Sequence, residues 1–271
     1  MAVIASRPPV GALLREWRDR RRLSQFELAL QAGVSTRHLS FVETGRSRPS
    51  SEMILHLAEE LEVPLRDRNH LLLAAGYAPA FAERELDAPE MGPVRDAIEQ
   101  VLRGHEPNPA LVVDCHWGLV AANRPVQALI TGVADHLLEP PINVLRLSLH
   151  PEGLAPRIVN LHEWRRHLLE RLAGEALASG DPALTALHDE LAAYPGGDPT
   201  ASVDPAFADI ALPLRLRHDG AELAFISTKT TFSSAADVTV AELSIESFYP
   251  ADPDTAAAVS MLLERASRAP F

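Results

Sequence analysis

The stretch from residue 23 to residue 45, LSQFELALQAGVSTRHLSFVETG, constrains the fold of this chain more than any other. Ser24 is a preferred N-cap residue, and the helix that follows it is expected to stop at Gly33. Because glycine adopts positive φ angles without strain, Gly33 permits a tight turn. Ser35 or Thr36 then begins a second helix. The stretch therefore predicts two short helices that pack against each other at an angle.

The sequence on both sides extends this helical pattern. Apolar residues recur at spacings of three and four between residues 8 and 75, which is the period of amphipathic helices. One helix is expected before the stretch described above, a fourth is expected to begin at Ser50 or Ser51, and a fifth at Pro64. Residues 1–75 are therefore predicted to form a compact all-α domain of five short helices.

The charge of the chain is divided unevenly. Residues 1–50 contain nine arginines and four acidic residues, for a net charge of +5, whereas the whole chain carries −12. A basic segment on an acidic protein can contact phosphates while the remainder is repelled from them. This partition indicates a nucleic-acid partner for the N-terminal part and argues against a protein that coats nucleic acid along its whole length.

Composition also narrows the cellular setting. Cys115 is the only cysteine, so neither an intramolecular disulfide nor a cysteine-based zinc site can form, which fits a reducing compartment. No apolar run approaches the roughly 18–20 residues that span a bilayer, and no secretory signal is evident. We expect a cytoplasmic protein without a membrane partner.

Residues 76–93 contain three prolines and two glycines, which breaks the helical period and predicts a linker. Residues 94–271 are assigned to a second domain. After a short helix at residues 94–102, two β-prone runs at 110–114 and 117–122 flank a polar turn and predict a hairpin.

The rest of the second domain mixes helices and strands. Helices are expected at residues 124–130, near residue 144 and at 156–178, and a loop at 196–199. Strands are expected at residues 210–217, 222–232 and 238–248. Pro213 favours an edge or a bulge, and a change of parity at Ala241 indicates a bulge or a late strand start. These elements predict an α+β domain in which helices cover an antiparallel sheet.

The N-terminal motif resembles the Cro/C1-type (XRE) helix-turn-helix family over about residues 9–75. Its hallmarks Ser-Gln-x-Glu-Leu-Ala and Glu-x-Gly stand at residues 24–29 and 43–45. The resemblance implies a DNA-binding domain whose recognition helix, residues 35–43, enters the major groove of a double-stranded DNA operator. It also implies a homodimer that binds two half-sites about one helical turn, ~34 Å, apart.

The resemblance assigns roles to residues of this motif. Those expected at the DNA are Arg18, Gln25, Ser35, Thr36, Arg37, Ser40, Phe41, Arg46 and Arg48. Arg37 can pair bidentately with guanine, and Gln25 corresponds to a family position that bonds a phosphate. Phe41 departs from the polar residue common at its position, so it either contacts a thymine methyl or packs in the core. The plainer alternative is a helical bundle whose arginines form a solvated face.

The second domain resembles the ligand-binding domain of MmyB-like transcription regulators over about residues 95–250. The matching segments are residues 108–114, 117–123, 143–153, 158–164 and 237–248. The resemblance implies a PAS-like fold and a small-molecule sensor, with a fatty-acid-like ligand among the candidates and no other cofactor. It also implies a body that mediates or modulates dimerisation.

Polar residues that could hold such a ligand gather in one apolar stretch: Asn143, Arg146, His150, Arg157 and Asn160. A pocket with a few polar groups and an arginine suits a carboxylate-bearing ligand. The alternative is that Arg146 and His150 satisfy backbone carbonyls or acidic neighbours at a helix end. Trp117 and Trp164 are expected in the core or at its rim.

The sequence gives less support to an enzymatic function. His162 and His167 are five residues apart rather than the four of a zincin motif. Cys115 beside His116 would point to the opposite face of a strand, which favours a structural cysteine. Because no two histidines are four apart on one helix, a metal could bind only through residues distant in sequence.

The sequence therefore predicts a transcriptional regulator, not an enzyme, in which a ligand in the second domain biases the placement of two DNA-binding heads. The alternative keeps the DNA-binding head but treats the second domain as a dimerisation or protein-interaction module without a small ligand.

Overall fold

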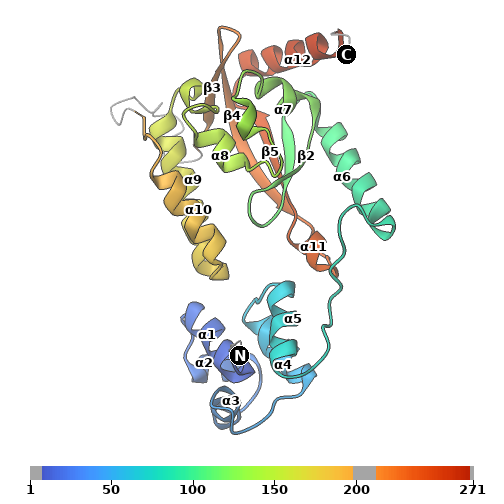
Figure 1. Ribbon diagram of the computed structural model, residues 1–271, viewed down its shortest axis with the longest axis vertical. Helices are drawn as coiled ribbons and strands as arrows, with labels where there is room; N and C mark the ends of the chain where they lie inside the picture. The colour runs from blue at the N-terminus through green and yellow to red at the C-terminus, as the bar shows by residue number, and fades with distance from the viewer. Residues whose placement is uncertain (1–7, 198–211, 269–271) are drawn as a thin grey trace, which may run out of the picture. The chain divides into compact units, whose positions relative to one another are not determined.

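The computed structural model describes residues 8–197 and 212–268 (Figure 1). The chain divides into two compact units, of which the first is built mainly from residues up to 85 and the second mainly from residues after 85. Within the described residues, the model contains no helix of the length and apolar character needed to span a membrane.

The described residues of the first unit up to residue 85 form five helices, as predicted. They are α1 (Val10–Arg20), α2 (Gln25–Gln31), α3 (Thr36–Glu43), α4 (Ser51–Glu60) and α5 (Leu65–Ala74). The side chains of Ser24, Ser35 and Ser50 accept hydrogen bonds from backbone N–H groups at the starts of α2, α3 and α4, which satisfies donors that a helix leaves without partners. Gly33 takes a φ of 63° between α2 and α3. The capping residues of the motif therefore set the helix boundaries.

One core holds these helices together. Its buried residues come from all five helices and include Leu14, Trp17, Leu28, Leu39, Val42, Ile54, Leu57 and Leu71. Gly11 lies so close to the end of α3 that an added Cβ would meet the Val42 carbonyl oxygen at 2.2 Å. Helix α1 thus packs directly on the helix that would enter a DNA groove.

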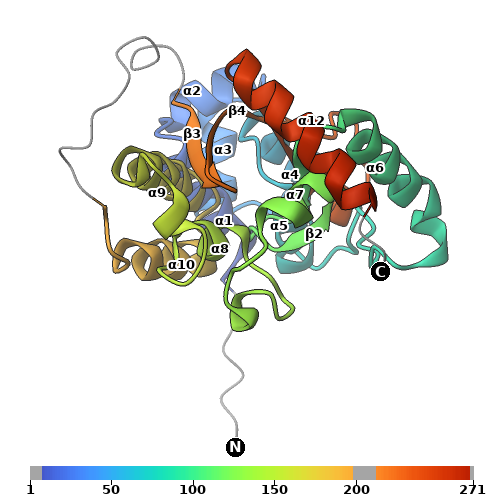
Figure 2. The ribbon, with the colours of Figure 1, turned by 90° about the horizontal axis from the view of Figure 1, so that it is seen from above.

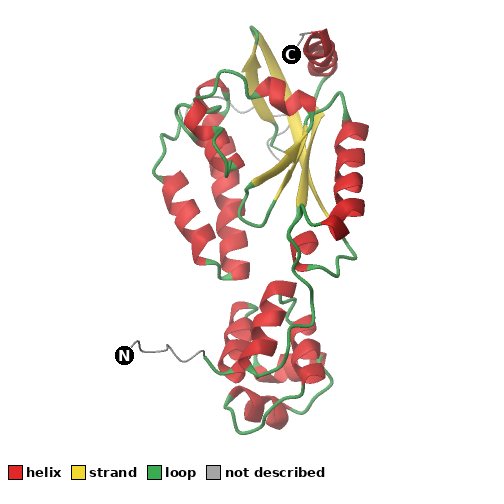
Figure 3. Cartoon of the chain, turned by 45° about the vertical axis from the view of Figure 1, so that its right-hand side comes forward, coloured by secondary structure: helices red, strands yellow, loops and turns green. Residues whose placement is uncertain are grey.

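The second unit is built on an antiparallel sheet (Figure 3). Its strands are β1 (Ala110–Val113), β2 (Leu119–Ala122), β3 (Leu214–His218), β4 (Ala221–Thr231) and β5 (Ser244–Pro250), in the order β2-β1-β5-β4-β3. Each neighbouring pair is antiparallel, as expected. Strand β3 begins after Pro213 and lies at an edge, which agrees with the position that proline favours.

Helices cover both faces of this sheet. The helices after residue 85 are α6 (Gly92–His105), α7 (Arg124–Leu129), α8 (Val144–Leu149), α9 (Leu161–Ser179), α10 (Pro182–Ala192) and α12 (Pro253–Arg268), with short 3-10 turns η1 (Pro89–Met91), η2 (Asp135–Leu137) and η3 (Ala155–Arg157). The short helix α11 (Val238–Ala241) is grouped with the first unit. Figure 3 shows α6 on one side of the sheet and α9 and α10 on the other. Helix α12 packs against α7 and β4 (Figure 2).

Alternation along the strands produces two separate cores. Ala110 and Val112 pack towards Ile98 and Leu102 of α6, whereas Val113 joins the larger core formed with α8, α9 and α10. Because successive strand residues face opposite sides of a sheet, this short strand contributes to both cores. The larger core lies on the face where the cavity described below is found.

Several sequence-based boundaries differ from those of the structure. Helix α9 begins at Leu161 rather than at residue 156, because Asn160 is held by β3: its side chain donates to the Pro213 carbonyl at 2.8 Å and accepts from the Arg215 N–H at 3.1 Å. Residues 238–241 form the helical turn α11 rather than strand, and β5 begins at Ser244, which is the late strand start given as one alternative for the change of parity at Ala241.

Helices α10 and α12 were not predicted. Asp181 and Pro182, a capping residue followed by a proline at the first helical position, marked the start of α10. The expected strand residues 210 and 211 and the loop residues 198 and 199 lie outside the described residues.

Candidate nucleic-acid interface and ligand cavity

Helix α3 turns its apolar residues inward and its polar residues outward. Leu39 and Val42 are buried, whereas Thr36 and Arg37 are exposed and Ser40 is partly exposed. Ser35 caps the helix, its hydroxyl oxygen accepting the His38 N–H at 3.1 Å. The helix therefore presents, on one surface, the three residues that were expected nearest the base edges.

Phe41 is half-buried at the C-terminal part of α3. The guanidinium groups of Arg37 and Arg46 lie over its ring, at 5.3 and 5.9 Å from the ring centre. Cations at this distance are attracted to the ring face. Phe41 thus packs against two exposed arginines, Arg37 on α3 and Arg46 just after it.

Arg18, which was expected to supply positive charge at the DNA, is buried and forms an ion pair with Glu43. It is 7% exposed, and its Nε and Nη2 donate to the Glu43 carboxylate at 2.7 and 3.0 Å. Hydrogen bonding to Glu43 raises the pKa of Arg18, while burial acts in the opposite direction. Gln25 is tied to the same carboxylate, since its Nε2 donates to Glu43 Oε2 at 2.8 Å.

Arg48 is exposed and fastened to the end of α5. Its Nη2 donates to the Ala75 carbonyl at 2.9 Å, and its guanidinium lies 5.4 Å from the Tyr77 ring. A cation at the C-terminus of a helix interacts favourably with the helix dipole. The arginines expected at the DNA therefore fall into two groups. Arg37 lies on α3 and Arg46 just after it, whereas Arg18 is bound to Glu43 and Arg48 to the end of α5.

A cavity of about 110 Å³ lies within the second unit, between the sheet and its helices. Its walls are mainly apolar side chains from α7, α8, α9 and the strands, among them Leu129, Ile130, Leu145, Leu154, Leu168, Leu216, Phe225 and Phe248. Trp117 and Trp164 are both buried and both line it. The indole N–H of Trp164 donates to Ser148 Oγ at 3.2 Å, so this wall is fixed by a hydrogen bond as well as by packing.

The cavity has one charged wall. Arg171 donates to Glu246 through Nη2 and, at 3.3 Å, through Nη1, and its guanidinium lies 4.5 Å from the Trp117 ring centre. Glu175 accepts from Trp117 Nε1 at 2.9 Å and from Lys229 Nζ at 2.8 Å. Of these four charged groups, only Arg171 and Glu246 line the cavity, and their opposite charges balance.

A known family has this architecture. Residues 94–262 match the family described as the MmyB-like transcription regulator ligand binding domain. The chain belongs to this family. Residues 9–71 match a helix-turn-helix domain. These matches confirm both resemblances seen in the sequence.

A curated relative agrees with this assignment. The HTH-type transcriptional regulator RghRB of Bacillus subtilis is 39% identical over 83 residues, which make up 30% of this chain and 58% of that protein. The chain therefore spans little more than half the length of that relative. The family evidence points to a transcriptional regulator with a helix-turn-helix and an MmyB-like ligand-binding domain, and not to an enzyme.

Within the MmyB-like domain, the five residues expected at the ligand lie outside the described lining of the cavity. Asn143 caps α8, Arg146 pairs bidentately with Glu190 at 2.7 and 2.8 Å, and His150 ends α8. Arg157 donates to Arg217 O, Thr131 O and His218 Nδ1, and Asn160 joins α9 to β3. All five satisfy backbone groups or neighbouring side chains, the alternative that was raised for Arg146 and His150.

Sequence reasoning missed Arg171 and Glu246, which form the charged wall of the MmyB-like cavity. Glu246 did leave a signal, because it is a charged residue in the middle of a strand whose neighbours Ile245 and Ser247 are buried. Arg171 left none, since it is one of several arginines along α9. Their meeting depends on a contact between residues 75 positions apart.

The Cys115–His116 pair also differs from expectation. Residues 114–117 form a turn rather than strand, so the two side chains are not on opposite faces, and Cys115 Sγ lies 3.6 Å from His116 Nδ1. His116 Nε2 in turn lies 2.7 Å from Asp181 Oδ2. The contact with Asp181 ties the turn between β1 and β2 to the start of α10.

Proposed function

We propose that this regulator binds a specific double-stranded DNA operator as a homodimer, through α3, and that a small and mainly apolar molecule in the MmyB-like domain controls this binding. The observation that carries the proposal is the cavity, which has apolar walls and one charge-balanced polar end, in a domain joined to a helix-turn-helix. Packed protein interiors contain few voids larger than a water molecule.

The DNA contacts follow from exposure. Thr36, Arg37 and Ser40 on α3 read base edges, and Arg37 is suited to guanine, since a guanidinium donates bidentately to O6 and N7. Arg46 contributes positive charge beside them. Gln25 is already bonded to Glu43, so a phosphate contact from Gln25 would use its second amide N–H.

The volume of the cavity limits the size of the ligand. A buried water needs roughly 10–15 Å³, and an engineered apolar cavity of about 150 Å³ accepts benzene. At about 110 Å³, the cavity fits a small apolar group. A longer fatty-acid-like chain would need wall residues to move or part of the chain to project outwards.

The balanced charges of Arg171 and Glu246 limit which polar group the ligand can carry. Arg171 is already paired with Glu246, so a ligand carboxylate would approach a carboxylate as well as a guanidinium. An uncharged polar group could accept from Arg171 or donate to Glu246 without that repulsion. The geometry therefore favours an uncharged head over the carboxylate suggested by the sequence, with the polar end at Arg171 rather than at Arg146.

Control of DNA binding requires that the ligand bind one conformation better than another, because a ligand can shift an equilibrium only by its differential affinity. In a dimer, two conformations of the second domain would hold the two heads at different separations, so that half-sites about one helical turn apart are matched in only one of them.

The test begins with denaturing extraction of the purified full chain and mass spectrometry of released small molecules, beside the native mass of the intact protein. Hexanol and hexanoate, which share a chain length and differ in the head, are then titrated into the protein, and operator affinity is measured with each. A stoichiometric ligand, or alcohol binding that changes operator affinity, supports the proposal. A dimer that is empty and whose operator affinity neither compound changes favours the dimerisation or protein-interaction alternative.

A further inference from the structure

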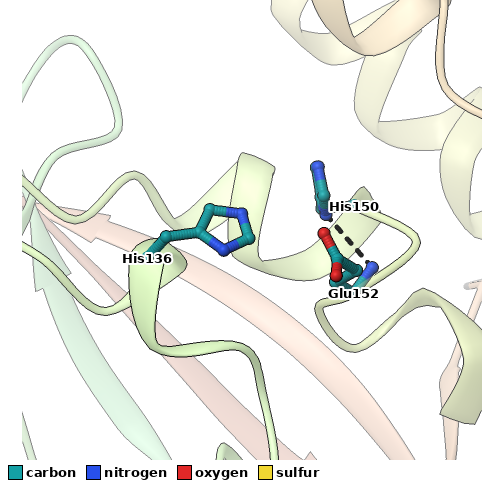
Figure 4. Close-up of side chains that lie close together, drawn as sticks. All are labelled: His136, His150 and Glu152. Carbon is teal, nitrogen blue, oxygen red and sulfur yellow. Dashed lines mark hydrogen bonds between the residues drawn. The ribbon is translucent and has the colours of Figure 1, made fainter.

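Three side chains capable of binding metal gather on the second unit, away from the lining of the cavity. They are His136, His150 and Glu152, and one ligand atom from each lies within 4.8 Å of the others (Figure 4). His136 belongs to η2, whereas His150 and Glu152 belong to the turn that follows α8. Two separate segments of the chain are thus brought together.

The backbone fixes this arrangement. The Ala134 N–H donates to the Glu152 carbonyl at 3.1 Å, which joins the η2 segment to the turn after α8. The turn itself is closed by the Gly153 N–H on the His150 carbonyl at 2.9 Å, and a Cβ at Gly153 would lie 2.3 Å from the Leu147 carbonyl oxygen. The two segments that supply the three side chains are therefore held together before any ion binds.

The rings are also placed by packing. The rings of His136 and His150 meet edge to face with centres 5.5 Å apart, and the ring of Tyr194 packs on His150 at 5.1 Å. Tyr194 is held in turn by its hydroxyl, which donates to Glu190 at 2.7 Å. Within the described residues, no ion pair engages the Glu152 carboxylate, which points towards both rings in Figure 4.

We propose that His136, His150 and Glu152 bind a divalent transition-metal ion of the zinc type. Imidazole nitrogens with one carboxylate suit Zn²⁺, Co²⁺ or Ni²⁺, whereas Mg²⁺ and Ca²⁺ prefer oxygen ligands. Metal–ligand bonds of about 2.0–2.2 Å place tetrahedral ligand atoms about 3.4 Å apart, so small rotations of the exposed His136 and Glu152 close the site. Three protein ligands leave a fourth position for water or a small ligand.

Binding exchanges one existing hydrogen bond. His150 Nδ1 accepts the Glu152 N–H at 3.1 Å, so the ion either takes that lone pair or binds Nε2 after the ring proton moves to Nδ1. In both cases the ion joins η2 to the end of α8. Because Ser148 and other α8 residues line the cavity, the site adjoins the wall of the ligand cavity, although its existence does not depend on the proposed function.

The experiment uses the full chain without an affinity tag, freed of metal by a chelator. Zn²⁺ affinity and stoichiometry are measured by competition with a chromogenic chelator, and Co²⁺ is added as a spectroscopic probe of the ligand set. The wild type is expected to bind one Zn²⁺ per chain. His136→Gln and Glu152→Gln are expected to lose at least about 10–100-fold in affinity, since even partners outside the coordination shell contribute that much.

The matched control is His70→Gln, because His70 is an exposed histidine 3.4 Å from Asp67 in the first unit and reports on ordinary surface binding. It should bind Zn²⁺ as the wild type does. His136 and Glu152 are the primary variants because His150 also packs on Tyr194. Equal Zn²⁺ affinity in the wild type, His136→Gln and Glu152→Gln would overturn the proposal, as would preference for Mg²⁺ over Zn²⁺.

Thermal unfolding provides a second readout that does not involve DNA or the cavity ligand. An ion that binds only the folded state raises its stability by mass action. Zn²⁺ should therefore raise the unfolding temperature of the wild type and of His70→Gln, and leave that of His136→Gln unchanged. A similar increase in all three proteins would assign the effect to other sites and contradict the proposal.

Discussion

Each domain contains an arginine–glutamate pair that joins distant parts of its chain, and the two pairs have different surroundings. Arg18 and Glu43 lie in the helical core with side chains 9% and 1% exposed, and Arg18 also donates to Asp19 and to the Leu23 carbonyl. Arg171 and Glu246, 21% and 6% exposed, line the cavity. The first pair is enclosed by packed side chains, whereas the second faces space that another molecule can occupy.

An arginine–glutamate pair therefore has a different role in a packed core than beside a cavity. In a close-packed core, neither partner can move without leaving a buried charge, so the pair fixes the arrangement of α1 and α3. Beside a cavity, the partners have space to rearrange, so under the proposed function this pair would distinguish one ligand head from another.

The largest effect is expected from Arg18→Met. It leaves Glu43 buried without its cationic partner, and breaking a buried pair in this way costs about 3–5 kcal/mol. Urea unfolding of the full chain, with hydrogen–deuterium exchange of peptides from residues 8–75 to locate the loss, measures it. Arg15→Met is the control, because Arg15 is an exposed arginine on the same helix. The double variant Arg18→Met, Glu43→Met should recover most of the loss, and equal instability of the double and single variants would contradict the account.

A smaller effect, and one on binding rather than stability, is expected from Arg37→Ala. Arg37 is exposed on α3 beside Phe41, so its removal should leave the unfolding free energy almost unchanged. Loss of a bidentate contact to guanine should weaken operator binding by about 1–3 kcal/mol and relax selectivity at one base pair. Fluorescence anisotropy at one salt concentration, with selected and scrambled operators, measures both. A uniform loss on both DNAs would make Arg37 a phosphate contact instead.

Arg18, Arg171 and Arg146 show how much of the structure could be predicted from the sequence. The helices of the first domain were predictable because Ser24, Ser35 and Gly33 act within a few residues of their positions. The neighbours of Arg18 and Arg171 were not, since each depends on a residue 25 or 75 positions away. Arg146 was selected as a ligand residue for its polarity in an apolar stretch, and its actual partner, Glu190, lies on a helix that the sequence did not predict.

The variant Glu246→Gln removes the negative charge from the wall of the cavity. The glutamine still accepts a hydrogen bond from Arg171, so the loss of stability should be only about 1–2 kcal/mol. Removing the negative charge should shift the preference towards a carboxylate ligand, by on the order of 10-fold in the ratio of hexanoate to hexanol affinity, which corresponds to about 1.4 kcal/mol. Glu190→Gln is the control, because Glu190 pairs with Arg146 outside the described lining of the cavity. An equal shift in both variants would show that the selectivity does not arise at the cavity wall.

The smallest effect is the expected change in the free energy of unfolding with pH, at Arg157, whose partner His218 can be protonated. Arg157 Nη2 donates to His218 Nδ1 at 2.7 Å, and burial, aided by Arg157, lowers the pKa of His218, while Asp219 acts to raise it. Above the unfolded pKa of about 6.5 the histidine is neutral in both states, and no stability is lost. As the pH falls below 6.5, the unfolded chain binds the proton first, so the free energy of unfolding falls until the lowered folded pKa is passed.

His218→Gln retains an acceptor for Arg157 but cannot be protonated, so it should reduce the slope of unfolding free energy against pH between 7.5 and 5.5. The slope should not vanish, because burial also lowers the pKa of His167. Urea unfolding at pH 5.5, 6.5 and 7.5 measures the slopes, with His70→Gln as the control. If His218→Gln kept the wild-type slope, the contact between Arg157 and His218 would not contribute to the pH dependence of stability, and this prediction would be wrong.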